Sequence, residues 1–278
     1  MPTAASETDF LTELLRAYWF APPVALWRAI ELRVVAQETF RHPLLDLGCG
    51  DGLIADALFH PAQVDVGIDP WLDQLRKAAH SGVYRWVEQA DGHHLPFADA
   101  AFATAFSNSV LEHIPDVAPV VEEVGRVLKP GGRFIFTVPS DAFHQLLHVY
   151  HRRLANGDRS GAEAYAAQID HQLAHHHYHT PAEWAELLAR GNMEMEKAVY
   201  YIPEAVEHLW DRMNARFGVL RRSLWTLLAS PRLRGAPHQR LMERWVVRSL
   251  GRAWHPYYKQ DVPAGEKGGG LLVVGRRN

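Results

Sequence analysis

The stretch LLDLGCGDG, residues 44–52, sets three alternating glycines directly after a short apolar run. Its leucines are typical of a buried parallel strand, and from Leu53 the apolar residues return with helical spacing. Glycine permits a sharp turn and lets backbone N–H groups approach a ligand closely. We therefore predict a strand, a nucleotide-binding turn and a helix in this order.

The spacing of the glycines narrows the choice of ligand. A dinucleotide fingerprint that starts at Gly48 requires another glycine at position 53, where the chain has Leu53. A phosphate-binding P-loop requires Gly-Lys followed by Ser or Thr, and the sequence has no such run. The pattern that remains is D-x-G-x-G-x-G, with Asp46 before the glycines and Asp51 among them. An acidic turn of this kind favours a cationic cofactor.

Composition restricts the class of protein. The chain has 278 residues, enough to bury a core, and its formal net charge of −3 excludes a generic nucleic-acid coat. The single cysteine, Cys49, cannot form an internal disulfide, which fits a reducing compartment. No apolar run approaches the ~20 residues that span a bilayer. We expect a soluble, cytoplasmic protein.

Two further acids follow predicted strands. Residues 64–69 form the second strand and end in Asp69, about twenty residues past the glycine turn, where a carboxylate can accept both ribose hydroxyls. Asp69 also suits the N-cap of the next helix, with Pro70 in its first turn, and the two roles can coexist. Asp91 and Gly92 follow the third strand, 83–87, and by themselves also fit a simple turn dipeptide.

The fourth predicted strand, 102–106, leads into Ser107 and Asn108. Ligands of open α/β sheets bind beyond the carboxyl ends of the strands, so these two residues are placed to meet a cofactor or an acceptor. A helix at 117–128 and a fifth strand at 133–139 follow. Thr180-Pro181-Ala182-Glu183 is a capping box that opens another helix, and strands at 193–201 and 271–274 complete the pattern.

These motifs resemble the class I S-adenosylmethionine-dependent methyltransferases, from about Leu44 to about Ser140 and more weakly from His175 to Pro203 and at the last strand. The resemblance implies a doubly wound, mostly parallel seven-stranded α/β sheet with an α-helical cap, and S-adenosylmethionine as cofactor. In that family the glycine turn cradles the methionine part, an acid lies near its amino group, and a later acid meets the adenine. The implied cofactor-binding residues are Asp46, Gly48, Cys49, Gly50, Asp69, Pro70, Asp91, Gly92, Ser107 and Asn108.

Histidines supply the candidate catalytic residues. His113 belongs to a Leu-Glu-His sequence that recurs in the family, although a histidine after a strand is often structural. A dense group, His171 to His179, allows three interpretations: a general base for a hydroxyl acceptor, a metal site with His171 and His175 on one helical face, or a polar surface turn. We select His113, His177 and His179 as catalytic candidates and predict no metal.

The remaining segments surround this core. We expect N-terminal helices within 1–40 (at 6–20 and 24–40), the cofactor-binding core at 41–140, a helical cap segment at 141–180, a core helix and strand at 181–202, a basic aromatic helical insertion at 203–259, and the C-terminal strand within 260–278. The insertion is net positive and rich in tryptophan and tyrosine. It suits an anionic substrate, an interfacial membrane contact, a dimer surface, or a cap with inward aromatics.

The predicted reaction is methyl transfer to a nucleophilic oxygen, nitrogen or carbon atom of a small-molecule or lipid-like acceptor. Many methyltransferases that act on amino groups of nucleic acids and proteins carry an Asn/Asp-Pro-Pro-Tyr/Phe signature after the fourth strand. This sequence has Ser107-Asn108-Ser109-Val110 at that place instead. No nucleic-acid partner is expected. Two alternatives remain open at this point: an aminopropyl-transferring enzyme of the same fold, and a catalytically silent cofactor-binding or membrane-surface protein. The sequence leaves the acceptor and the oligomeric state undetermined.

Overall fold

The computed structural model describes residues 9–217, 224–228, 230 and 237–278. The chain divides into two compact units, each made of three segments. The sheet unit comprises residues 38–143, 173–200 and 270–278, and the helical unit comprises 1–37, 144–172 and 201–269.

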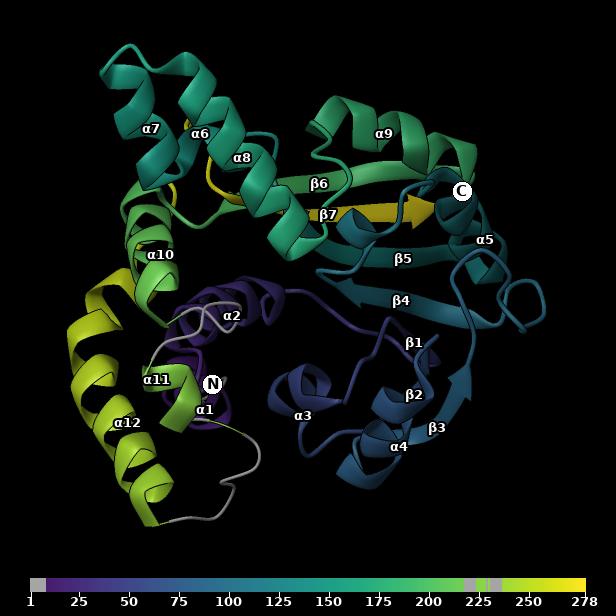
Figure 1. Cartoon of the computed structure of the whole chain (residues 1–278). Coiled ribbons are helices and arrows are strands. Elements are labelled where there is room, and N and C mark those ends of the chain that lie inside the picture. The colour runs from purple at the N-terminus through teal and green to yellow at the C-terminus, as the bar shows by residue number, and fades with distance from the viewer. Residues whose placement is uncertain (1–8, 218–223, 229, 231–236) are drawn as a thin grey trace, which may run out of the picture. The chain divides into compact units, whose positions relative to one another are not determined.

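A seven-stranded sheet forms the sheet unit, in the order β3-β2-β1-β4-β5-β7-β6 (Figure 1). Parallel pairing joins β1 to β2, β1 to β4, β2 to β3 and β4 to β5, whereas β7 runs antiparallel to β5. The strands are β1 (Leu44–Leu47), β2 (Val64–Asp69), β3 (Tyr84–Gln89), β4 (Phe102–Asn108), β5 (Leu128–Pro139), β6 (Met193–Tyr201) and β7 (Gly270–Arg277). The predicted fold class is confirmed.

Amphipathic helices bury their apolar faces against this sheet. Helix α4 packs on β2 and β3, while α5 and α9 pack on each other and on β5 and β7. Thr180 and Glu183 form the predicted capping box of α9, and Trp184 behind them is fully buried. The helical segments of this unit are α3 (Leu53–Phe59), α4 (Leu72–Ser81), the 3-10 turn η1 (Leu111–His113), α5 (Ala118–Val127) and α9 (Pro181–Arg190).

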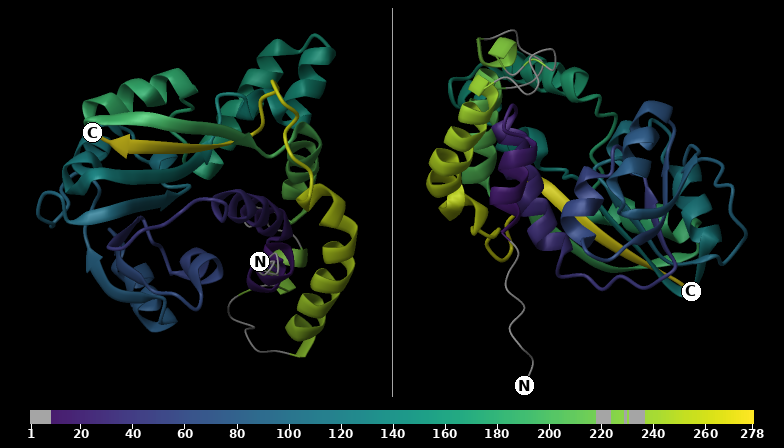
Figure 2. Two further views of the ribbon diagram at one scale, coloured as in Figure 1. Left: turned by 180° about the vertical axis from the view of Figure 1, so that it is seen from behind. Right: turned by 90° about the horizontal axis from the view of Figure 1, so that it is seen from below.

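Helices dominate the second unit. Helix α12 runs alongside α1 and α2, and α10 packs on α2 and α7 (Figures 1 and 2). The buried carboxylate of Glu31 accepts a hydrogen bond from the Tyr201 hydroxyl at 2.7 Å, which ties α2 to the chain that enters α10. The helices are α1 (Phe10–Ala17), α2 (Pro22–Val35), α7 (His148–Ala155), α8 (Arg159–Leu173), α10 (Glu204–Phe217), α11 (Leu224–Leu228) and α12 (Pro237–Tyr258), with the short α6 (Phe143–Leu146) at the boundary of the units.

Several element boundaries differ from the sequence prediction. Helix α1 covers 10–17 rather than 6–20, of which 6–8 lie outside the described residues, and α2 begins at Pro22 because proline fits the first helical turn. Strand β5 begins at Leu128, before the predicted residue 133. Helix α8 ends at Leu173, so His171 and His175 do not share a helical face, and that form of the metal hypothesis is wrong.

Candidate functional site

The predicted glycine turn follows β1 and has a left-handed backbone at all three glycines. Gly48, Gly50 and Gly52 have φ angles of 75°, 54° and 83°, which disfavour residues with a side chain. A Cβ atom at Gly48 would lie 2.5 Å from the side chain of Val110. The N–H groups of the first two turn residues both donate to the Ile68 carbonyl at 2.9 Å. The turn is therefore fixed between β2 and the segment after β4.

Asp69, at the end of β2, holds the turn from one side. Its carboxylate accepts hydrogen bonds from the Gly50 N–H at 3.0 Å and from the Trp71 N–H at 2.8 Å. The side chain is buried, with 6% of the residue exposed. Helix α4 has Trp71 at its N-cap and no side-chain cap bond, so the N-cap interpretation of Asp69 is wrong. Its neighbour Pro70 precedes the helix, and the Pro70 carbonyl accepts from Gln89 at 3.0 Å.

Asp46 is buried within β1 and forms a pair with a tyrosine that the sequence analysis missed. The Tyr84 hydroxyl donates to the Asp46 carboxylate at 2.5 Å. Burial and the nearby charge of Asp69 together raise the pKa of Asp46 to about 7, although the hydrogen bond from Tyr84 opposes this rise. Burial, with Asp46 and Asp69 nearby, also raises the pKa of the Cys49 thiol. That thiol stays protonated and is not a nucleophile at neutral pH.

The Asp91-Gly92 turn sits at the start of a loop that is tightly held. Asp91 accepts from the His93 N–H at 2.8 Å, so a turn exists here as the local sequence suggested. A Cβ atom at Gly92 would lie 2.8 Å from Val120 of α5, which explains the need for glycine. The Asp91 side chain is 60% exposed. Its carboxylate is thus reachable from solvent on a loop whose base contacts α5.

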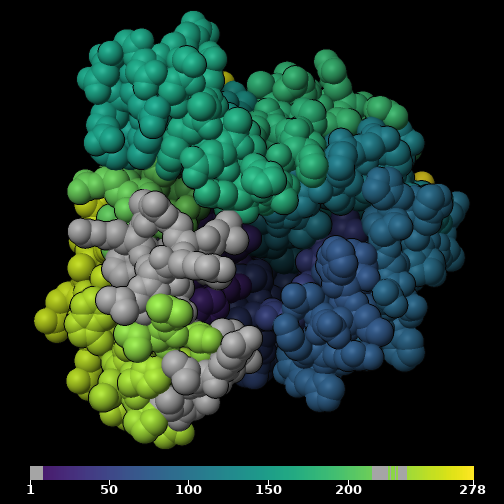
Figure 3. All heavy atoms as spheres, in the orientation of Figure 1, coloured from purple at the N-terminus to yellow at the C-terminus, as the bar shows by residue number. Residues whose placement is uncertain are grey.

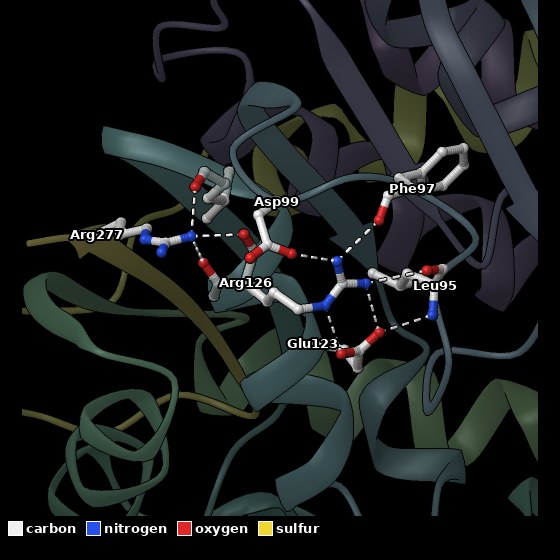
Figure 4. A network of polar contacts seen from close by, with 8 residues as sticks. Leu95, Phe97, Asp99, Glu123, Arg126 and Arg277 are labelled. Carbon is white, nitrogen blue, oxygen red and sulfur yellow. Dashed lines mark hydrogen bonds and ion pairs between the residues drawn. The ribbon is translucent and has the colours of Figure 1, made fainter.

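Arg126 of α5 anchors the rest of that loop (Figure 4). Its guanidinium donates to the carbonyls of Phe97 and Leu95 at 2.8 and 3.0 Å and to Asp99 at 2.8 Å. Glu123, one turn earlier, accepts from Arg126 at 2.7 and 2.8 Å and from the Leu95 N–H at 2.9 Å. The Arg126 guanidinium holds the pKa of Glu123 below its usual range. This ion pair therefore keeps the loop in place at neutral pH.

A second arginine fixes the end of the same helix. Arg277 of β7 donates through one nitrogen to three carbonyls where α5 passes into β5, those of Gly125, Arg126 and Leu128. These carbonyls belong to a helix C-terminus, where a cation is electrostatically favoured. The sequence analysis did not identify this residue, because its partners lie far away in the chain.

Ser107 and Asn108 end β4 as predicted but differ in their surroundings. The Ser107 side chain is fully buried and its hydroxyl donates to the Leu47 carbonyl at 2.9 Å, which links β4 to β1. Asn108 is half-buried and pairs in register with Thr137 of β5. Ser109 then adopts a left-handed backbone with φ 50° and turns the chain toward the glycine turn. The serine hydroxyl is committed to the backbone, whereas Asn108 lies at the strand end.

The His-rich segment after α8 lies along the turn that follows β4. The His176 N–H donates to the Glu112 carbonyl at 2.9 Å, and His113 Nδ1 is 3.0 Å from the Ala174 carbonyl oxygen. The rings of His113 and His175 have centroids 5.3 Å apart, and His113 Nε2 is 4.0 Å from Glu112. His113 therefore groups with Glu112 and His175, two residues that we had not selected although Glu112 lies within the Leu-Glu-His sequence.

His177 and His179 form a separate stacked pair. Their ring centroids are 4.4 Å apart, and both rings contact Trp184 of α9. His177 Nε2 is 3.1 Å from the Ile114 carbonyl oxygen. Burial lowers the pKa of both imidazoles, so both are neutral at pH 7. The three predicted catalytic histidines thus belong to two ring clusters: His113 of η1 with His175, and His177 with His179.

The sequence of this chain is similar to those of known methyltransferases over the segment that contains the glycine turn. A family model described as a methyltransferase domain matches residues 45–136, which run from β1 into β5. A probable S-adenosylmethionine-dependent methyltransferase of Mycolicibacterium smegmatis is 30% identical over 125 residues, 44% of this chain and 46% of that protein. A ubiquinone biosynthesis O-methyltransferase of Paracidovorax citrulli is 36% identical over 103 residues, 34% of this chain and 42% of that protein. The chain thus matches less than half the length of these relatives.

Solved structures show the same fold at low identity. An S-adenosylmethionine-dependent methyltransferase from Thermotoga maritima is 14% identical with a TM-score of 0.56, over 96% of this chain and 100% of that one. A geranyl diphosphate methyltransferase is 15% identical with a TM-score of 0.52, over 89% of this chain and 77% of that one. These solved structures show the fold, and the family model matches residues 45–136 to a methyltransferase domain.

Proposed function

We propose that this chain, whose residues 45–136 match a methyltransferase domain, is a class I S-adenosylmethionine-dependent methyltransferase that transfers a methyl group to a nucleophilic atom of a small-molecule or lipid-like acceptor. The observation that carries this proposal is the Asp69 carboxylate, buried at the end of β2 and bound to the N–H of Gly50 in the glycine turn. A carboxylate fixed there accepts the ribose hydroxyls of a nucleoside beside the turn.

The cofactor carries a sulfonium and an ammonium group, which suit an acidic site. The charge of Asp69 helps to raise the pKa of Asp46, and a cation bound nearby would favour the ionised form of Asp46. In this proposal the turn residues Gly48, Cys49 and Gly50 receive the methionine part, and Asp46 lies near its amino group. Asp69 and Pro70 flank the ribose, Asp91 and Gly92 meet the adenine, and Ser107 and Asn108 border the reacting end.

The chain's own residues contribute mainly alignment and one proton transfer. The sulfonium already activates the methyl group, so correct alignment of the acceptor can supply ~7–11 kcal/mol of the barrier reduction. Because His113 Nδ1 is 3.0 Å from the Ala174 carbonyl oxygen, a proton on Nδ1 donates to that oxygen. Nε2 is then the unprotonated nitrogen and can accept the acceptor's proton. His177 and His179, held neutral by burial, are further candidates for this step.

Support for a small or lipid-like acceptor comes from the relatives. Among them are enzymes named for O-methylation in ubiquinone biosynthesis, and a structural neighbour is named for geranyl diphosphate.

The test is turnover with defined acceptors. Purified protein with S-adenosylmethionine is offered phenols, amines and isoprenoid lipids, and S-adenosylhomocysteine is measured by mass spectrometry. We expect acceptor-dependent S-adenosylhomocysteine formation that Asp69→Ala abolishes. Asp73→Ala, at an exposed acid of α4, is the matched control and retains activity. Cofactor binding without turnover on any acceptor class would favour the catalytically silent alternative.

A peripheral membrane contact is a second proposal, carried by the exposed face of α12. Leu241 and Trp245 are 65% and 52% exposed, and Arg244 and Arg248 are exposed beside them. Tryptophan and leucine next to arginine favour binding to anionic lipid interfaces. Among the described residues, no helix is both long and apolar enough to cross a bilayer. Sedimentation with phosphatidylserine vesicles at low salt tests this contact, and equal binding by a Leu241→Ser, Trp245→Ser double variant would exclude it.

A further inference from the structure

Within the helical unit, three potential metal ligands converge on one point between α7 and α10. His151 Nδ1 and His208 Nε2 each lie 3.6 Å from the same carboxylate oxygen of Glu204. All three ligand atoms lie within 4.8 Å of one another. Helices α7 and α10 contact each other, and Figure 3 shows teal atoms of the α7–α8 segment next to green atoms of the α10 segment at the surface.

These distances do not correspond to ordinary hydrogen bonds. A nitrogen and an oxygen 3.6 Å apart exceed the hydrogen-bond range, so neither imidazole satisfies Glu204 directly. His208 Nε2 is buried and has no hydrogen-bond partner among the described residues. A buried polar atom without a partner is costly unless another group binds it. The two imidazole nitrogens and the Glu204 carboxylate therefore leave room between them for a cation.

The geometry fits a small divalent cation. Zinc bonds of about 2.0–2.1 Å in tetrahedral geometry place neighbouring ligand atoms roughly 3.3 Å apart. The observed 3.6 Å separations differ from this by a few tenths of an ångström, within the reach of small side-chain rotations. Two imidazoles and one carboxylate are also a donor set that zinc accepts, with a fourth position left for water.

The backbone of α7 and α10 holds the three side chains close to one another. Glu204 and His208 are four residues apart on α10 and so share one helical face. The neighbouring turn of α7 is tied to α10 because the Val149 N–H donates to the buried Asp211 carboxylate at 2.9 Å. The His148 ring lies 5.3 Å from that of His208 and adds a further imidazole beside the cluster. A fixed backbone framework of this kind favours metal binding over a chance encounter of surface side chains.

We propose that His151, Glu204 and His208 form a zinc-binding site that joins α7 to α10 in the helical unit. The site is separate from the glycine turn and serves to stabilise the helix pair, because binding to the folded state alone adds to stability.

Zinc titration of tag-free protein tests the site, with calorimetry for affinity and cobalt(II) absorption for tetrahedral geometry. We expect one zinc per chain, and zinc affinity at least about tenfold weaker in His151→Ala and in Glu204→Gln. His151 and Glu204 are 57% and 54% exposed, so their substitution should leave the fold intact, as circular dichroism can verify. His171→Ala, at an exposed histidine of α8, is the matched control and keeps wild-type affinity.

A second cluster of the same composition provides the critical contrast. Glu112, His113 and His175 in the sheet unit also have ligand atoms within 4.8 Å of one another. Because His113 and His175 already contact the Ala174 carbonyl and the Tyr178 hydroxyl, we expect His175→Ala to leave zinc affinity unchanged. Loss of binding in His175→Ala with retention in His151→Ala would overturn the proposal and move the metal to the sheet unit. Failure of the wild-type protein to bind zinc would overturn it outright.

Discussion

Two clusters of identical composition, one in each unit, differ in what their side chains already bind. In the sheet unit, Glu112 is 3% exposed, and His113 Nδ1 lies against the Ala174 carbonyl at 3.0 Å. His175 Nδ1 is 2.9 Å from the Tyr178 hydroxyl. Each imidazole there has a partner that fixes its orientation, and the Ala174 carbonyl also fixes the tautomer of His113.

In the helical unit the carboxylate of the cluster is much more exposed, and both imidazoles lie near it. Glu204 is 54% exposed and lies 3.6 Å from both His151 and His208. The comparison shows that the same residue types can serve different roles. The hydrogen bonds around the histidines determine which role is available to them. A histidine with a fixed tautomer at the turn after β4 can carry a proton, whereas converging ligands on two helices can hold a cation.

The largest expected effect is on kcat, which should depend on the cluster in the sheet unit and not on the cluster in the helical unit. His113→Ala should lower kcat by about 10²–10⁴-fold, the usual contribution of a general base, while leaving S-adenosylhomocysteine affinity unchanged. His151→Ala should leave kcat unchanged. Steady-state kinetics on the best acceptor measures both. Equal kcat in the wild type and His113→Ala would assign the proton transfer elsewhere, first to His177 and His179.

Zinc should raise the free energy of unfolding by binding to only one of the two clusters, that of His151, Glu204 and His208. At a free zinc concentration one hundred times the Kd, the folded state gains about 2.7 kcal/mol, and Tm rises accordingly. This rise should disappear in His151→Ala and persist in His175→Ala, as differential scanning fluorimetry with and without zinc would show. A rise that persists in His151→Ala and disappears in His175→Ala would reverse the roles of the two clusters.

The pH dependence of cofactor binding should follow Asp46 rather than either histidine cluster. Its pKa of about 7 in the free protein should fall when the cofactor's cationic group binds nearby, so binding releases a proton and affinity rises with pH. Between pH 6 and pH 8 the increase should be about tenfold. Asp46→Asn should abolish the pH dependence, and His113→Ala should retain it, in calorimetric titrations at each pH.

The same raised pKa predicts how the free protein responds to pH. Asp46 binds its proton more tightly in the folded than in the unfolded state, so its contribution to stability is present at low pH. That contribution is lost as the pH rises toward and through 7. An unchanged pH dependence of the unfolding free energy in Asp46→Asn would contradict the raised pKa.

The smallest expected effect concerns the loop after Asp91. Arg126→Met removes the contacts that hold this loop on α5 and should weaken cofactor binding by roughly tenfold or less, about 1.4 kcal/mol. Arg159→Met, at an exposed arginine paired only locally with Glu163 among the described contacts, is the matched control. Equal affinity in both variants would show that the loop does not contribute to the nucleoside site.

Local signals explain what the sequence predicted well. The glycine turn and the capping box at Thr180 depend on residues within a few positions of one another. Their backbone preferences act before any tertiary contact forms. The doubly wound, mostly parallel seven-stranded sheet followed from the family resemblance.

Contacts between distant segments explain what the sequence did not predict. The hydrogen bond from Tyr84 to Asp46 joins β3 to β1, and His113 meets His175 across a long stretch of chain. The end of α8 at Leu173 removed the helical face that would have joined His171 to His175. The meeting of His151 with His208 depends on the packing of α7 on α10. None of these contacts has a local sequence signature.

Calorimetric titration of S-adenosylhomocysteine into the wild type, Asp69→Ala and Asp73→Ala tests the cofactor site most directly. The side chain of Asp69 is buried and bound to Gly50 and Trp71, whereas that of Asp73 is 89% exposed. Loss of charge-assisted hydrogen bonds to the ribose should weaken binding by about a hundredfold or more in Asp69→Ala. Micromolar binding by the wild type and Asp73→Ala, with this loss in Asp69→Ala, is the predicted result. Absence of binding by the wild type, or equal binding by all three proteins, would contradict a cofactor site at the glycine turn.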